Sequence, residues 1–123
     1  MFITLEGPEG SGKSTQIKRL AERLQALGYP VITTREPGGT PIGDQIRQVL
    51  VRMENQELHP RTEILLFLAA RAQLVEQVVK PALRDGKIIL CDRYGDSTLA
   101  YQGYGHGLDL EKLRQMLAFA TDQ

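Results

Sequence analysis

Short, continuous apolar runs alternate along the chain with longer stretches in which apolar residues recur every three to four positions. The short runs are rich in β-branched side chains, which predicts buried strands at residues 2–6, 31–34 and 87–92. The longer stretches predict amphipathic helices over residues 17–27, 41–50, 62–79 and 109–120. We therefore expect the element order β-α-β-α-α-β-α.

Local turn and cap residues support these boundaries. Gly28 and Pro30 follow the first helical pattern and predict its end. Thr40 is placed to cap the second helix, whose first residue would be Pro41. Pro81, together with the Arg-Asp-Gly turn that follows it, is expected to close the long third helix.

Strands that are apolar along their whole length are typical of a parallel sheet with helices on both faces. Right-handed crossovers would bring the carboxyl ends of these strands to one edge, where ligands bind in such folds. The 123 residues, with 41% hydrophobic and 24% charged content and no internal repeat or linker, match one ordinary domain. We expect a single three-layer α/β/α domain over residues 1–123.

Charge and cysteine content narrow the possible partners. Fifteen basic and fifteen acidic residues give a net charge of zero, which does not favour a nucleic-acid partner. The sequence shows neither a signal-peptide pattern nor a long apolar segment, so we expect a cytoplasmic protein without a membrane partner. Cys91, the single cysteine, follows apolar residues, which predicts a buried, reduced thiol rather than a nucleophile.

The segment GPEGSGKST lies between the first strand and the first helix and fits the pattern G-x-x-x-x-G-K-[ST]. In this context backbone N–H groups converge on phosphates, Lys13 reaches the β- and γ-phosphates, and the Ser14 hydroxyl can bind Mg²⁺. The segment predicts a nucleoside triphosphate site formed by Gly7, Pro8, Glu9, Gly10, Ser11, Gly12, Lys13, Ser14 and Thr15. The same loop serves ATPases, GTPases and kinases, so it leaves the reaction open.

Charged residues also follow the other two strands. Asp92 ends the third strand, where a carboxylate can hold Mg²⁺; an exposed strand-end or helix-capping residue is the alternative. Arg35 and Arg93 would project toward the same edge, and arginine suits bidentate phosphate contacts. Because the glycine loop already binds one set of phosphates, two further arginines favour a second phosphate group, that of an acceptor. Solvated surface side chains are the alternative.

Phe67 and Arg71 lie four positions apart on the long predicted helix and therefore share a face. A ring beside a guanidinium could stack on a base and hydrogen-bond to it. The spacing alone favours Phe67 in the core with Arg71 reaching outward to solvent. The polar, aromatic and glycine-rich stretch at residues 97–107 suits a substrate loop and a surface loop without function equally well.

Four motifs together resemble the bacterial type of the thymidylate kinase family: FITLEGPEGSGKST, REPGGTPIGDQIR, LLFLAARAQLVEQVV and ILCDRYGDSTLAYQG. Members of this family are P-loop nucleoside monophosphate kinases that transfer a phosphoryl group from ATP to dTMP. The resemblance covers the whole chain. It implies a P-loop NTPase-type α/β/α fold, ATP and Mg²⁺ as cofactors, dTMP as acceptor and a homodimer formed through helix faces.

The resemblance also implies individual roles. Lys13, Arg93 and Glu9 would be catalytic, and Ser14 and Asp92 would bind the metal ion. In the acceptor site, Glu9 would face the sugar, Arg35 and Arg93 would hold the 5′-phosphate, and Phe67 and Arg71 would contact the base. Thr98 would hydrogen-bond the thymine edge, and Tyr101 would crowd the 2′ position. The implied dTMP pocket consists of Glu9, Arg35, Phe67, Arg71, Arg93, Thr98, Tyr101 and Gln102.

Members of the family continue past the point where this sequence stops, with two more strands, a lid that carries a catalytic arginine and a loop over the adenine. We therefore expect the chain to hold only the N-terminal part of the fold and the native protein to be longer. Two alternative functions stay open. One is a kinase for another nucleoside monophosphate or small acceptor; the other is a GTPase switch, because residues 92–95 read D-x-x-G, although no N-K-x-D element occurs.

Overall fold

The computed structural model describes residues 1–7, 10, 12–52, 57–93, 107 and 109–122. Within these ranges three parallel strands form one sheet in the order β1-β3-β2, so that the last strand in sequence lies in the centre. The strands are β1 (Phe2–Leu5), β2 (Val31–Arg35) and β3 (Ile88–Asp92). The parallel sheet that the apolar runs predict is confirmed.

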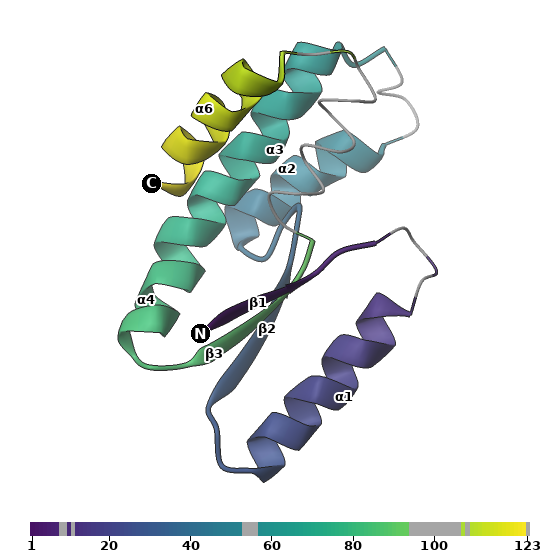
Figure 1. Ribbon diagram of the computed structural model, residues 1–123. Helices are drawn as coiled ribbons and strands as arrows, with labels where there is room; N and C mark the ends of the chain where they lie inside the picture. Colours follow the sequence, from purple (N-terminus) through teal and green to yellow (C-terminus); the bar gives the residue numbers. More distant parts are fainter. Residues whose placement is uncertain (8–9, 11, 53–56, 94–106, 108, 123) are drawn as a thin grey trace.

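Helices lie on both sides of the sheet (Figure 1). One face is covered by α1, and the other by the continuous helical segment α3–η2–α4, against which α2 and α6 pack through α3. The helices are α1 (Lys13–Ala26), α2 (Pro41–Val51), α3 (Pro60–Leu74), the π-helical turn η2 (Val75–Val79), α4 (Lys80–Arg84) and α6 (Leu110–Thr121). Across the described part of the chain, none of these helices combines the length and hydrophobicity needed to cross a bilayer.

The pleat of the central strand divides the core into two halves. Ile88 and Leu90 pack against α1, whereas Ile89 packs against α3, η2 and α4 on the opposite face. A third apolar cluster joins α3 to α6 through Leu68 and Leu113. Because β3 contributes to both halves, it is buried from Ile88 to Cys91. Packing on both faces therefore fixes the position of its carboxyl end, at Asp92.

The long helix passes through Pro81, contrary to the prediction that this proline closes it. The π-helical turn η2 lies directly before α4, and Pro81 falls within the first turn of α4. Because a π turn shifts the hydrogen-bond ladder, it can accommodate the missing N–H of a proline and the bulk of its ring. The helix ends instead at the Arg-Asp-Gly turn, where Gly86 has a φ of 73°.

The segment between β2 and α2 is fixed by its own side chains. Thr40 caps α2 as predicted, since its Oγ1 accepts a hydrogen bond from the Gly43 N–H at 2.9 Å. The Gly39 N–H donates to Asp44 Oδ1 at 3.1 Å. Gly39 has a φ of 84°, and a Cβ atom there would lie 2.4 Å from Thr34 Oγ1. This position therefore requires glycine, both for its backbone conformation and for lack of space.

Candidate functional site

The parallel register brings the ends of all three strands to one edge of the sheet. Asp92 of β3 is paired with Leu5 of β1 on one side and with Arg35 of β2 on the other. The pairing continues one residue further, because the Arg93 N–H donates to the Leu5 carbonyl and the Glu36 N–H donates to the Asp92 carbonyl, both at 3.0 Å. The glycine loop, Asp92, Arg35 and Arg93 therefore meet at this edge, as the sequence predicts.

The glycine loop leads directly into the N-terminus of α1. Its described glycines, Gly7, Gly10 and Gly12, have φ values of 149°, 79° and 88°, and Gly12 is the N-cap residue. Lys13 is the first helical residue and is only 8% exposed. Its Nζ lies 3.2 Å from Asp92 Oδ1, which places its charge at the end of the central strand. Pro8, Glu9 and Ser11 lie outside the described residues, whereas Ser14 and Thr15 are exposed on the first turn of α1.

A cleft of about 310 Å³ lies beside this loop, between the ends of β2 and β3 and the helices α2 and α3. We call it the arginine cleft; the residues of interest along it are Ser14, Arg35, Arg47, Phe67, Asp92 and Arg93. Glu36 and Glu63 also line it. When Lys13 and Arg71, which pair with two of these carboxylates, are included, five cationic side chains face three carboxylates. This surplus of two positive charges suits a phosphate monoester, which carries nearly two negative charges at neutral pH.

Arg93 occupies a strained backbone conformation at the rim of this cleft. Its φ is 68°, in the left-handed region that a residue with a Cβ atom enters at a cost of about 1–2 kcal/mol. Two contacts hold it there: its N–H bonds to the Leu5 carbonyl, and the Cys91 Sγ donates to its carbonyl at 3.0 Å. Strain of this kind persists where neighbouring contacts enforce it, commonly at functional sites. Cys91 itself is buried, as predicted.

Asp92 and Ser14 form the border shared by the glycine loop and the arginine cleft. Asp92 Oδ1 is buried and accepts no hydrogen bond, although Lys13 Nζ lies within ion-pair distance of it. Among the described residues no group of three or more His, Cys, Asp or Glu side chains could hold a metal ion. A phosphate-bound Mg²⁺ needs only one or two protein ligands, because phosphates and waters supply the rest. A carboxylate oxygen that lacks a hydrogen-bond donor, next to a hydroxyl, fits that requirement.

Arg71 is buried. This differs from the outward, solvent-facing orientation that its spacing from Phe67 favoured. The side chains of Arg71 and Glu36 are 2% and 4% exposed, and Arg71 Nε lies 2.8 Å from both carboxylate oxygens of Glu36. Arg71 Nη2 also donates to Glu36 Oε2. Burial raises the pKa of Glu36, and the hydrogen bond from Arg71 opposes this rise. Phe67, one turn earlier on α3, is half-buried and lines the arginine cleft.

Several residues that line the cleft are absent from the set that the sequence predicts, and two of them are charged residues of one motif. Glu36 is one; Arg47 of α2 is the other, and its Nη1 donates to the Pro37 carbonyl at 3.3 Å. Both belong to the REPGGTPIGDQIR motif, but the strand order that brings them beside Phe67 is not contained in the motif. Thr98, Tyr101 and Gln102 lie outside the described residues.

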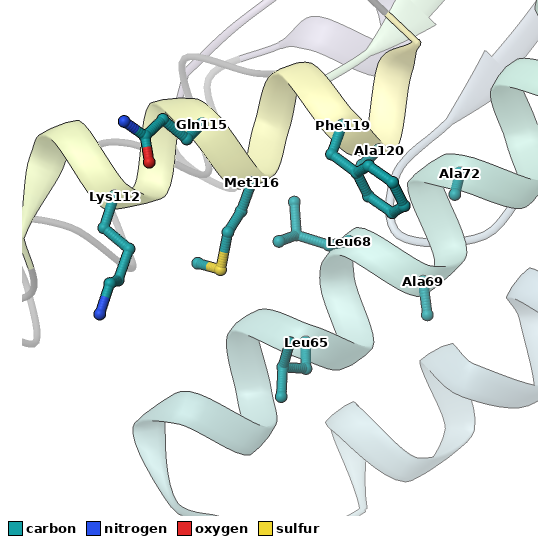
Figure 2. Close-up of a pocket in the computed structure, with 9 residues that line it drawn as sticks. All are labelled: Leu65, Leu68, Ala69, Ala72, Lys112, Gln115, Met116, Phe119 and Ala120. Carbon is teal, nitrogen blue, oxygen red and sulfur yellow. The ribbon is translucent and has the colours of Figure 1, made fainter.

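A second hollow of about 410 Å³ lies between α3 and α6, away from the strand ends. Figure 2 shows Met116 of α6 and Leu68 of α3 pointing toward each other across it. Its lining is apolar apart from Lys112 and Gln115. Because it has no carboxylate, hydroxyl or paired charge to act on a substrate, the arginine cleft is the better candidate for the chemical site.

The comparisons with known proteins point to one family. The family model described as Thymidylate kinase matches residues 5–122. The thymidylate kinase of Syntrophotalea carbinolica is 64% identical over 120 residues, which are 98% of this chain and 56% of that protein. The thymidylate kinase of Roseiflexus castenholzii is 61% identical over 121 residues, again 98% of this chain and 53% of that protein. The chain therefore spans about half the length of the curated relatives it matches.

A solved structure agrees with the sequence comparison. The crystal structure of thymidylate kinase from Ehrlichia chaffeensis matches with a TM-score of 0.90 and 44% identity, over 98% of this chain and 67% of that one. This likeness confirms the P-loop NTPase-type α/β/α fold that the motifs predict. Together with the match of the family model to nearly every residue, it means that the chain belongs to the thymidylate kinase family.

Proposed function

We propose that the protein transfers the γ-phosphoryl group of ATP to dTMP, giving dTDP and ADP, and so contributes to the supply of dTTP. Membership of the thymidylate kinase family supports this proposal. The observation that carries it is the common border of two anion sites. Ser14 and Asp92 lie at the glycine loop and also line the arginine cleft, so phosphates bound in the two places would meet there.

The proposed reaction is an in-line displacement. An oxygen of the dTMP phosphate attacks the γ-phosphorus of ATP, the bond to the bridging oxygen breaks, and ADP leaves. The acceptor oxygen is already anionic, so the step requires no general base. Lys13 and the amides of the glycine loop would neutralise the charge that develops on the transferred group. Arg35 and Arg93 would hold the acceptor phosphate in line, and Glu9 would face its sugar.

Ser14 and Asp92 are the proposed protein ligands of Mg²⁺. When bound, the ion would offset the negative charge of the phosphate groups. Two observations support this proposal: Asp92 ends the central strand, and its Oδ1 lies 3.2 Å from Lys13 Nζ at the end of the glycine loop. Both proposed ligands line the arginine cleft as well as bordering the glycine loop.

The base of the acceptor would bind at the α3 end of the arginine cleft. Phe67 lines the cleft and offers a ring for stacking, and Arg71 lies one turn further along the same helix. Thr98, Tyr101 and Gln102 are proposed to complete the pocket on the thymine edge and the sugar. Exclusion of a 2′-hydroxyl by Tyr101 would favour deoxyribose.

We propose that the protein acts as a homodimer in the cytoplasm, where ATP and nucleoside monophosphates are available. The apolar hollow between α3 and α6 would be part of the dimer contact, because Phe119 at its edge is 91% exposed and Leu65 is exposed as well. An exposed apolar patch of this kind is more often covered by another chain than left in water. Sedimentation velocity with a Phe119→Asp variant tests this contact; a variant that sediments like the wild type would contradict it.

The decisive test is a calorimetric titration with dTMP, run beside dUMP, the ribose form of TMP, AMP and GDP, after a melting curve has shown that the protein is folded. Selective binding of dTMP supports the proposal. Tighter binding of AMP would favour a kinase for another nucleoside monophosphate, and tighter binding of GDP would favour a nucleotide switch.

A further inference from the structure

Glu36 directly follows β2 and is held from two sides. Its backbone N–H donates to the Asp92 carbonyl at 3.0 Å, which ties it to the end of the central strand. Its carboxylate lines the arginine cleft and binds the guanidinium of Arg71. The residue therefore connects the phosphate end of the cleft, at Asp92, with the helix that carries Phe67 and Arg71.

The contact with Arg71 fixes a plane. The guanidinium donates through Nε to both carboxylate oxygens and through Nη2 to one of them, a two-point arrangement that sets the orientation of the whole group. Arg71 is 2% exposed and comes from a helix 35 positions away in sequence. At 2% exposure the side chain has little contact with bulk solvent, and its hydrogen bonds to the Glu36 carboxylate set the direction of the guanidinium.

From these contacts we infer that Glu36 is a positioning residue: it holds Arg71 beside Phe67 in the orientation that recognises the pyrimidine base of the acceptor. The inference rests on the proposed function, since it assigns the base to this end of the cleft. Thymine presents two carbonyl oxygens, which a donor-only guanidinium can contact. Without the carboxylate, the guanidinium would lose the partner that fixes its plane, and the base would lose an oriented donor.

The test measures binding of dTMP and of an ATP analogue with a nonhydrolysable β–γ bond by calorimetry. In Glu36→Gln, which keeps the shape but removes the charge, the dissociation constant for dTMP should rise by about 10- to 100-fold, as for loss of a hydrogen bond to a charged group. The dissociation constant for the ATP analogue should not change. Glu76→Gln, the same substitution at an exposed site, is the matched control and should bind dTMP normally.

Repeating the Glu36→Gln substitution in an Arg71→Met variant shows whether Glu36 acts through Arg71 or through a general effect on the structure. In Arg71→Met, where there is no guanidinium to orient, the same Glu36→Gln change should alter the dTMP dissociation constant by no more than about twofold. An effect of equal size in both backgrounds would show that Glu36 does not act through Arg71. Unchanged dTMP binding in folded Glu36→Gln, or an equal loss of affinity for the ATP analogue, would also overturn the inference.

Folding is checked by the melting curve of each variant. If Glu36→Gln does not fold, Glu36→Asp replaces it, because aspartate keeps the charge but shortens the side chain by one methylene. The pattern expected is the same, with a smaller loss of dTMP affinity, and wild-type affinity would contradict the inference. A wild-type protein that binds no dTMP contradicts the proposed function itself, whereas normal wild-type binding with unaffected Glu36 variants contradicts only the role of Glu36.

Discussion

The ammonium group of Lys13 and the carboxylate of Asp92 form an ion pair at 3.2 Å, joining the start of α1 to the end of β3. Lys13 is almost fully buried, and the Asp92 carboxylate lies within ion-pair distance of its ammonium group. Triphosphate binding would present Lys13 with a second anion, and an ion at Asp92 would compete for the same oxygen. The pair would therefore hold the lysine close to the proposed phosphate site before the substrate binds.

Replacement of this lysine tests the proposed phosphoryl transfer. In Lys13→Ala we expect turnover to fall by at least about 100- to 1,000-fold, because a preorganised positive charge at the transferred group is lost. Binding of dTMP, measured by calorimetry, should be largely unchanged, since the proposed acceptor site is the arginine cleft. Arg19→Ala, at an exposed position of the same helix, serves as control. Comparable activity in Lys13→Ala would exclude the assigned role.

Asp92→Asn should change the response to magnesium. Removal of the negative charge weakens a Mg²⁺ ligand, so we expect the Mg²⁺ concentration for half-maximal activity to rise about 10-fold or more. The measurement is a Mg²⁺ titration of the initial rate at saturating ATP and dTMP. Asp85→Asn, in the exposed turn after α4, should follow the wild-type curve. If both variants follow that curve, Asp92 is not a metal ligand.

The strained backbone of Arg93 predicts a difference between two substitutions. Arg93→Gly and Arg93→Ala both remove the guanidinium, and both should weaken dTMP binding by about 10-fold or more. Only glycine relieves the positive φ of 68°. The free energy of unfolding, measured in urea, should therefore be about 1 kcal/mol larger for Arg93→Gly than for Arg93→Ala. This figure already allows for the extra conformational freedom of glycine in the unfolded chain. Equal stability would mean that the conformation costs nothing.

Gly39 should be far less tolerant than Gly28, although both have positive φ values, 84° and 91°. A Cβ at Gly39 would meet Thr34 Oγ1 at 2.4 Å and Leu74 Cδ1 at 2.8 Å, whereas a Cβ at Gly28 meets no atom within 4 Å. We expect Gly39→Ala to lower the unfolding free energy by about 2–4 kcal/mol and Gly28→Ala by about 1–2 kcal/mol. Urea denaturation of both variants gives the comparison; similar losses would contradict the packing argument.

The Cys91 thiol makes stability depend on pH above 9. Burial, reinforced by the nearby Glu36 charge, raises the pKa of Cys91 well above its ordinary value of 9.0, so the native thiol keeps its proton when the unfolded thiol has lost it. Its contribution to stability is therefore complete below pH 9 and decreases by up to about 1.4 kcal/mol per pH unit above it. Urea denaturation between pH 8 and 10.5 should show a shallower decrease for Cys91→Ala than for the wild type. Parallel curves would contradict the shift.

Local chemistry allowed much of the fold to be predicted, whereas pairing between distant segments did not follow from the pattern. The Thr40 cap and the apolar strands depend on neighbours within a few residues, and both are confirmed. The burial of Arg71 depends on Glu36, which reaches it only because β2 lies beside β3 in front of α3. The helix through Pro81 depends on a π turn, for which a helical pattern gives no indication.

The order β1-β3-β2 also has a consequence for the way the protein forms during synthesis. The first two strands leave the ribosome early but do not pair with each other; each pairs with β3, whose residues 88–92 emerge much later. Until then, neither strand has the central partner that aligns its end, and apolar faces of α1 and β1 stay partly uncovered. The nascent chain should thus acquire protease resistance in a single late step, with the nucleotide loop and the arginine cleft maturing together.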